Sequence, residues 1–255
     1  MTTMNPIEAR IRSREWHLPP GVRAASTTRA GGASEGNWAS LNLARHVQDD
    51  PVHVEANRER LVRALGLPGE PVWLNQVHAA QVAILKGGEK EPAADAAFTR
   101  VPGVVCAIMT ADCLPVLFAD QSGGAVAAAH AGWRGLAGGV LEATLECFDD
   151  PTRLTAWLGP AIGPTAFQVG DEVREVFIAH DSAAQDAFKP DGAGHWLADI
   201  YQLARQRLSA MGVTRIQGGG RCTFSEPERY FSYRRDRKTG RMASLIWIEE
   251  ETANE

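Results

Sequence analysis

The sequence lacks the features that mark membrane proteins, secreted proteins and nucleic-acid-binding proteins. No uninterrupted apolar run approaches the ~18 residues that a membrane-spanning helix requires, and no apolar signal-peptide core stands near the first residues. The formal net charge of −5 gives no general attraction for phosphate backbones or anionic lipids. These absences predict a cytoplasmic protein that binds neither membranes nor nucleic acids.

Cysteine is scarce, and the four cysteines are widely spaced with no CxxC pair among them. This spacing, in a chain without secretion signals, argues against a disulfide framework. Cys106, Cys147 and Cys222 are expected to be small buried hydrophobes, as free cysteines commonly are. The fourth, Cys113, stands next to an aspartate and suits a functional site.

The composition is that of a globular protein, with 44% apolar and 22% charged residues and no low-complexity tract or fixed-period repeat. A chain of 255 residues allows one large domain or two small ones. We expect a single domain over residues 1–255, with flexible ends at about residues 1–10 and 250–255.

Hydrophobic periodicity predicts an α/β protein with mixed β-sheets covered by helices, because adjacent strands alternate irregularly with helices. Helices are expected over residues 50–66, 141–148, 171–180 and 197–211. Strands are expected over residues 71–74, 81–85, 104–109, 114–118, 125–130 and 243–248, with a polar loop over 86–95 and short strands and loops before residue 48.

Three potential metal ligands stand at the ends of expected strands: His78 in NQVH, Cys113 in ADCLPV, and His130 in AHAGWRG. Zinc takes imidazole nitrogen and cysteine thiolate, and catalytic zinc sites use three protein ligands and leave one position open. The separations of 35 and 17 residues mean that the three can meet only through the tertiary fold. We therefore predict a zinc site, with copper as the alternative metal.

Other residues are candidates for binding substrate or moving protons. Asp112 lies in an apolar stretch, where a carboxylate without partners is unfavourable, and it can orient a metal-bound histidine, accept a proton or cap a helix. Arg29, Asn75 and Arg235 are candidate substrate-binding residues, because arginine suits bidentate binding of phosphate and Asn75 shares a block with His78. The glycine-rich turn over 132–139 either presents backbone N–H groups to phosphate or packs tightly.

The residue pattern leaves several functions open. A His, Cys, His set also occurs in copper proteins, although laccase chemistry normally uses many histidines and this chain has seven. Among those outside any ligand-like block are His17, His46, His53 and His180. A metal-free hydrolase with Cys113 as nucleophile and His130 as base is a further possibility, as is a binding module without catalysis.

Five blocks in the chain together resemble the YfiH-like laccase-domain family, whose members are also labelled polyphenol oxidase, purine nucleoside phosphorylase or peptidoglycan editing factor. These blocks are NQVH, TADCLPVLF, HAGWRG, LGPAIGP and FSYRRDRKTGR, and the resemblance runs from about Thr27 to Ile248. The chain departs from the family pattern at Gln48 and Ala79, where glycines are expected, and at Gln168, where glutamate is expected.

The resemblance implies a layered α/β/β/α sandwich like that of toxin-type cysteine hydrolases, with a metal, usually zinc, held by His78, Cys113 and His130. It also implies phosphorolysis of adenosine, inosine, guanosine and methylthioadenosine, with adenosine deamination as a companion activity. The expected partners are then a purine nucleoside and phosphate, and the expected catalytic residues are Asp112, Cys113 and His130. Copper-dependent phenol oxidation and editing of peptidoglycan precursors are the alternative activities that the resemblance suggests.

Overall fold

The computed structural model describes residues 16–250. The expected flexible ends lie outside these residues, apart from Glu250, and stay a prediction. Among residues 16–250, no helix combines the length and the apolar character needed to cross a bilayer.

The larger of two central sheets is six-stranded and mixed, in the order β11-β7-β5-β6-β3-β2. Its strands are β2 (Val82–Leu85), β3 (Ala96–Thr99), β5 (Leu114–Asp120), β6 (Val126–Ala131), β7 (Leu154–Leu158) and β11 (Arg215–Gly218). The β2–β3 and β7–β11 pairs are parallel and the other pairs are antiparallel. At the centre, Val116 of β5 pairs with Ala129 on one side and with Leu158 on the other.

The smaller sheet is antiparallel and joins distant parts of the chain in the order β1-β12-β4. Its strands are β1 (Val22–Ser26), β4 (Cys106–Thr110) and β12 (Met242–Ile248). Leu245 of β12 pairs with Ala25 of β1 and with Ala107 of β4. The C-terminal strand therefore lies between an N-terminal strand and a strand from the middle of the chain.

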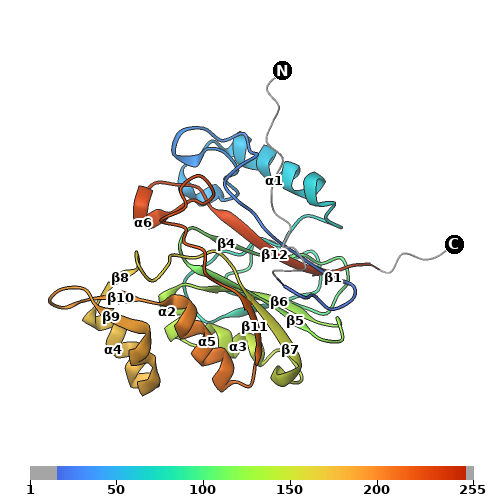
Figure 1. Cartoon of the computed structure of the whole chain (residues 1–255). Helices are drawn as coiled ribbons and strands as arrows, with labels where there is room; N and C mark the ends of the chain where they lie inside the picture. The colour runs from blue at the N-terminus through green and yellow to red at the C-terminus, as the bar shows by residue number, and fades with distance from the viewer. Residues whose placement is uncertain (1–15, 251–255) are drawn as a thin grey trace.

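The two sheets pack face to face, because alternate residues of each strand point to opposite sides. Ile246 of β12 and Leu117 of β5 are both buried in the layer between the sheets. On the outer face of the smaller sheet, Leu245 packs with Leu61 of α1. On the outer face of the larger sheet, Val116 lies in a core that includes α3 and α5. Figure 1 shows α1 over one sheet and α3, α4 and α5 over the other, so the predicted α/β/β/α layering is confirmed.

Six α-helices are present in residues 16–250. They are α1 (Pro51–Leu65), α2 (Trp133–Ala137), α3 (Val140–Leu145), α4 (Asp171–His180), α5 (Ile200–Ala210) and α6 (Tyr233–Asp236). The α1 helix begins as the sequence predicts, because Asp50 caps it by accepting a hydrogen bond from the Val52 N–H and Pro51 occupies its first turn. It ends at Gly66, which adopts φ +61.

Short elements complete the chain. The described part of the chain has four 3₁₀ helices, η1 (Gly36–Trp38), η2 (Arg45–Val47), η3 (Pro151–Arg153) and η4 (Ser182–Ala187). A third, three-stranded sheet is formed by β8 (Gln168–Gly170), β10 (His195–Ala198) and β9 (Phe188–Pro190).

Three predicted elements differ from the structure. Residues 71–74 were expected to form a strand, but this segment makes only an isolated bridge from Val72 to Cys106, and so lacks a continuous ladder. The glycine-rich turn contains a helix, α2, and Gly139 at φ +90 separates it from α3. The helix expected from residue 197 begins at Ile200, because Leu197 pairs in β10. Strands β3, β7, β8, β9 and β11 were not predicted, since each is short and lacks a clear alternating pattern.

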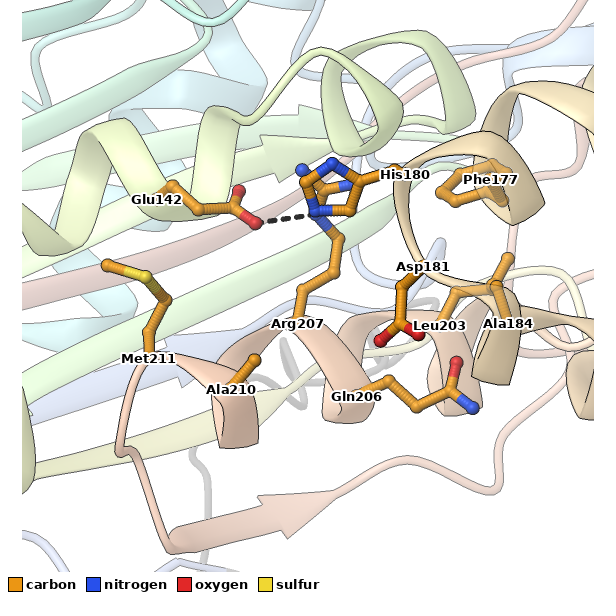
Figure 2. A pocket seen from close by; sticks show the side chains of 10 residues that line it. All are labelled: Glu142, Phe177, His180, Asp181, Ala184, Leu203, Gln206, Arg207, Ala210 and Met211. Atoms are coloured by element: carbon orange, nitrogen blue, oxygen red, sulfur yellow. Dashed lines mark hydrogen bonds and ion pairs between the residues drawn. The ribbon is translucent and has the colours of Figure 1, made fainter.

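A cavity of about 160 Å³ lies within the helical layer outside the larger sheet (Figure 2). Its lining comes from α3, α4, η4 and α5. Arg207 of α5 and Glu142 of α3 face it and form an ion pair, with Arg207 Nε and Glu142 Oε1 2.6 Å apart. This pair ties α3 to α5. None of the candidate site residues lines this cavity.

Candidate metal centre

His78 lies in an irregular turn that the buried carboxylate of Asp95 holds in place. The Asp95 carboxylate accepts hydrogen bonds from the backbone N–H groups of Val77, His78 and Ala79, at 3.1, 2.9 and 2.7 Å. His78 adopts φ +60, which is uncommon for a residue other than glycine. These three bonds offset the cost of that backbone conformation and fix the direction of the His78 side chain.

Cys113 occupies the connection between β4 and β5, directly after Asp112, which has φ +96. The Asp112 carboxylate accepts hydrogen bonds from Thr223 Oγ1 (2.5 Å), Ser232 Oγ (3.1 Å) and the Arg234 N–H (2.7 Å). Asp112 thus ties this connection to the segment around α6. The structure thus gives the Asp112 carboxylate partners from far along the chain.

His130 lies on β6 and is oriented by the same aspartate that holds the His78 turn. Its ring Nδ1 lies 2.8 Å from Asp95 Oδ1, and its backbone N–H donates to the Asp95 carbonyl oxygen at 2.7 Å. A carboxylate accepting from Nδ1–H leaves the lone pair of Nε2 free for a metal. The residue that orients the histidine is therefore Asp95, and not Asp112 as the sequence suggested.

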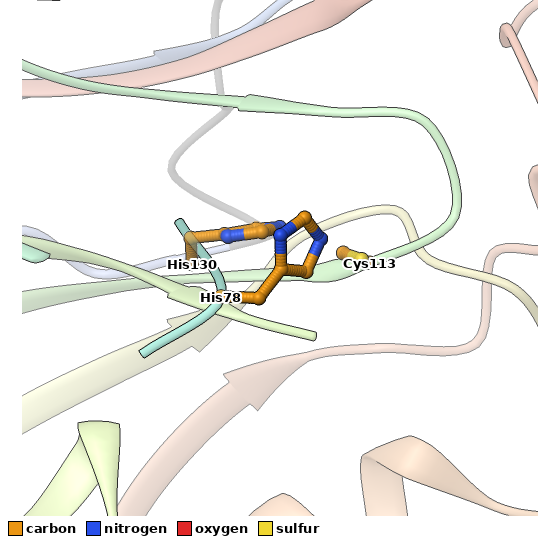
Figure 3. A group of neighbouring side chains, drawn as sticks. All are labelled: His78, Cys113 and His130. Atoms are coloured by element: carbon orange, nitrogen blue, oxygen red, sulfur yellow. The ribbon is translucent and has the colours of Figure 1, made fainter. Parts of the chain in front are cut away.

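The three expected ligands converge in space (Figure 3). The potential ligand atoms of His78, Cys113 and His130 all lie within 4.8 Å of one another. The two imidazole rings meet edge to face, with centroids 4.8 Å apart and an interplanar angle of 75°. In a tetrahedral site with bonds of ~2.0–2.3 Å, ligand atoms lie about 3.5 Å apart, so small side-chain shifts suffice to close the set on an ion. Two imidazoles and a thiolate suit zinc or copper.

Charges around Cys113 favour its thiolate form. Burial alone would raise the pKa of Cys113, but the charge of His130 and hydrogen bonds from both histidines lower it below the ordinary thiol value. Burial opposes protonation of His130, but Cys113 and Asp95 raise the pKa of its imidazole. Burial of Asp95 is likewise outweighed by hydrogen bonds from His130 and the Ala79 N–H, which lower the pKa of its carboxyl. These shifts favour a thiolate–imidazolium pair between Cys113 and His130, so a metal that binds both residues must displace the proton of the imidazole.

The three candidate ligands lie in a cavity of about 290 Å³, close to the lower end of the usual size of small-molecule sites. Aromatic rings of Phe167 and Tyr233 and the cationic side chains of Arg234 and Arg241 line it. His46, which the sequence pattern set aside, also lines it. The cavity combines apolar faces, positive charge and the candidate ligands.

Arg29, Asn75 and Arg235 do not line this cavity. Arg29 donates from Nε to the Ala39 carbonyl oxygen at 2.8 Å, and its guanidinium lies 4.7 Å from the Phe231 ring centroid. Arg235 donates to the carbonyl oxygens of Thr223, Phe224 and Tyr230. Asn75 pairs through its backbone with Ala93. Both guanidinium groups therefore hold loops together, and the contact of these three residues with substrate stays a prediction.

Sequence reasoning missed Asp95 and did not single out Arg241. Asp95 ends the polar loop and directly precedes the apolar strand β3, so a lone carboxylate beside an apolar run was the available signal. Arg241 was one of several cations in the basic cluster over 233–241, and only the fold distinguishes it from the others.

Comparison with known proteins gives consistent results. A family model described as "Multi-copper polyphenol oxidoreductase laccase" matches residues 23–249. The purine nucleoside phosphorylase YfiH of Escherichia coli K12 is 58% identical over 239 residues, which cover 92% of this chain and 97% of that protein. A purine nucleoside phosphorylase of Pseudomonas aeruginosa is 54% identical over 242 residues, covering 92% of this chain and 97% of its own length.

Solved structures share the whole fold. A Neisseria meningitidis protein of family DUF152 has a TM-score of 0.89 and 47% identity, with 96% of this chain and all of that chain covered. The YfiH protein of Bacillus licheniformis has the same TM-score at 31% identity, with the same coverage of both chains.

Proposed function

The chain belongs to the multi-copper polyphenol oxidoreductase laccase family, and from this premise we propose that it is a zinc-dependent purine nucleoside phosphorylase. The resemblance to YfiH-like proteins in five sequence blocks is confirmed by the relatives. The proposed substrates are adenosine, inosine, guanosine and methylthioadenosine, together with phosphate.

The observation that carries this proposal is the convergence of His78, Cys113 and His130 in a cavity that also has aromatic and cationic walls. Phe167 and Tyr233 give the cavity wall aromatic rings against which a purine can pack, each with an arginine guanidinium nearby: Arg234 at 5.8 Å from the Phe167 centroid and Arg241 at 6.0 Å from the Tyr233 centroid. Arg234 and Arg241 supply positive charge for a phosphate. Both substrates of a phosphorolysis therefore find complementary groups in one cavity.

In the proposed reaction, a phosphate oxygen forms a bond to C1′ of the ribose while the bond from C1′ to N9 of the purine breaks. The purine leaves with the bonding electron pair and takes up a proton, and the other product is ribose 1-phosphate. A divalent metal held by the three ligands would supply Lewis-acid polarisation at its open position.

The chain's own residues position and protonate the reactants. Asp95 fixes the His78 turn and the His130 ring, which keeps the ligand geometry constant during the reaction. Asp112 lines the cavity beside Cys113 and is our candidate proton carrier, with the hydroxyl groups of Thr223 and Ser232 as its neighbours. This role for Asp112 stays a prediction.

Adenosine deamination is proposed as a companion activity. A water oxygen would form a bond to C6 of the purine while the amino group leaves as ammonia, giving inosine. Deamination would use the same metal position and the same purine-binding rings. Because water replaces phosphate as the nucleophile, deamination needs no phosphate, and this difference separates the two activities experimentally.

The test is chromatography of adenosine incubated with the purified protein, with and without inorganic phosphate. We expect adenine only when phosphate is present, with ribose 1-phosphate equal in amount to adenine plus the hypoxanthine formed from inosine. Inosine should accumulate in the sample without phosphate. Cys113→Ala is expected to lose both activities, because one of three ligands is removed. Absence of phosphate-dependent adenine in the wild-type protein would overturn the proposal.

Copper-dependent oxidation of phenols is the second candidate, because the family description names it and a His, Cys, His set also suits copper. Elemental analysis of the native protein beside Cys113→Ala distinguishes the two. We expect one zinc per chain in the wild type and none in the variant. Stoichiometric copper with oxygen uptake on phenols would favour the oxidase instead.

A further inference from the structure

Arg241 stands apart from the other arginines near the metal centre. It precedes β12 by one residue, and its backbone N–H donates to Asn42 Oδ1 at 2.9 Å, which fixes the base of the side chain. Its side chain lines the same cavity as Cys113 and His130. The guanidinium group of Arg241, next to the smaller sheet, therefore forms part of the cavity wall.

The guanidinium of Arg241 is only partly engaged by the protein. Nη1 donates to the carbonyl oxygens of Thr239 (2.9 Å) and Gly240 (3.0 Å). Within residues 16–250, Nε and Nη2 donate no hydrogen bond and no carboxylate lies within ion-pairing distance. Arg235, in contrast, uses Nε, Nη1 and Nη2 on carbonyl oxygens and on Asp236.

The two free nitrogens form the side edge of the guanidinium, where their N–H bonds run parallel. This is the fork that binds two oxygens of a phosphate or carboxylate at once. The two hydrogen bonds from Nη1 to the loop already hold the Arg241 side chain in place. Little side-chain entropy is therefore lost when Nε and Nη2 bind an anion.

The cavity wall has an excess of positive charge. Arg234 and Arg241 line it, whereas Asp112 is the one carboxylate among the lining residues. Both Asp112 oxygens already accept hydrogen bonds from Thr223, Ser232 and the Arg234 N–H. Arg234 also has its guanidinium on the Gln168 carbonyl oxygen, at 3.0 Å from both terminal nitrogens. Within the described residues, both lining arginines keep the edge formed by Nε and Nη2 unused, but the carbonyl contacts of Arg241 are part-buried whereas those of Arg234 are exposed. We therefore assign an anion inside the cavity to Arg241, whose guanidinium is better shielded from water.

Resting on the proposed function, we propose that Arg241 binds the inorganic phosphate co-substrate in a bidentate contact through Nε and Nη2. The phosphate lies between Arg241 and the metal ligands, while the nucleoside occupies the side of Phe167 and Tyr233. Arg241 then determines the affinity for phosphate and contributes little to the affinity for the nucleoside. The phosphate group of a nucleoside monophosphate presents the same oxygens to Arg241 as inorganic phosphate does. The experiments below therefore compare the binding of these two ligands.

The experiment compares the metal-loaded wild type with Arg241→Met and Arg241→Lys. The KM for phosphate is measured at saturating adenosine, and the KM for adenosine at saturating phosphate. Arg241→Met is expected to raise the phosphate KM by about 10- to 100-fold, because two charge-assisted hydrogen bonds are lost. Arg241→Lys is expected to give an intermediate value, since it keeps the charge but loses the fork. The adenosine KM should change by less than about threefold.

Arg153→Met is the matched control, because Arg153 is exposed on η3, carries the same charge and does not line the cavity. It should leave the phosphate KM unchanged. Metal content and melting temperature are measured for every variant, and they should match the wild type. An unchanged phosphate KM in Arg241→Met would overturn the proposal.

Calorimetric titration separates this inference from the proposed reaction. Inorganic phosphate and adenosine monophosphate are each titrated into the zinc-loaded wild type and Arg241→Met, in the absence of adenosine so that neither proposed reaction runs. Phosphate binding that is lost in Arg241→Met supports the subsite even if no phosphorolysis occurs, in which case only the proposed function fails. Absence of phosphate binding to the wild type, or Arg241-dependent binding of the monophosphate alone, contradicts the assignment.

Discussion

At the scale of single residues, Asp95 does most to build the metal centre. Its side chain is 0% exposed, yet it accepts three backbone N–H groups and the ring of His130. Burying a carboxylate is unfavourable unless such partners are present. One carboxylate therefore fixes two of the three candidate ligands, His78 through its backbone and His130 through its ring.

We expect Asp95→Asn to weaken zinc binding by about 10- to 100-fold, because one oxygen becomes an NH₂ group that faces donors. The measurement is competition for zinc against a chromophoric chelator. Asp186→Asn is the control, since Asp186 is exposed on η4. Circular dichroism establishes that each variant is folded. Wild-type affinity in a folded Asp95→Asn protein would contradict the positioning role.

A similar argument explains one departure from the family pattern. Gln48 stands where a glycine is expected, and the structure gives it φ +63, the left-handed conformation that glycine adopts most readily. The expected glycine thus reflects the backbone of this turn, which glutamine adopts here at some cost in free energy.

At the scale of elements, the site depends on the close approach of two connections. Gly132 lies between β6 and α2, and Cys113 lies between β4 and β5. A Cβ atom on Gly132 would lie 2.9 Å from Cys113 Sγ and 3.4 Å from His78 Cδ2. The glycine thus provides the space in which two of the ligands meet.

Gly132→Ala is therefore expected to displace the Cys113 thiol and to weaken zinc binding by about tenfold or more, because catalytic and metal sites tolerate only shifts of ~0.5 Å. The overall stability should fall by less than the metal affinity does, since the backbone of Gly132 at φ −60 accepts an alanine. Gly69→Ala is the matched control, because a Cβ there meets nothing within 4 Å. Equal zinc affinity in both variants would show that the glycine is dispensable.

At the scale of the whole molecule, the two sheets share the buried layer that holds the site's strands in register. Leu117 of β5 and Ile246 of β12 meet in this layer, although they are distant in the chain. A common core between segments so far apart supports our proposal that residues 1–255 form one domain. The sheets are then expected to unfold together.

Leu117→Ala should lower the free energy of unfolding by about 2–5 kcal/mol, because Leu117 is 0% exposed and its loss leaves a cavity between the sheets. Urea denaturation followed by both tryptophan fluorescence and circular dichroism measures the change and tests for a single transition. Val52→Ala, at a position 72% exposed on α1, should change the stability by less than about 0.5 kcal/mol. Two separate transitions would contradict the single domain.

The sequence by itself determined the local features of this protein. It determined α1, because capping by Asp50, Pro51 and Gly66 acts within a few residues, and it determined the bounds of α4. Residue periodicity also determined the mixed α/β class, and the five blocks determined the family, whose resemblance implied the layering of the sheets.

Only the tertiary structure decided which side chains meet and which arginines remain free. Asp95 is 35 residues from His130 and Asp112 is 120 residues from Ser232, so no local periodicity relates them. Likewise, Arg29 and Arg235 resemble Arg241 in charge, but the loops around them satisfy their guanidinium groups with carbonyl oxygens. Long-range packing sets these distances, because pairing in the sheets brings together segments that the chain keeps far apart.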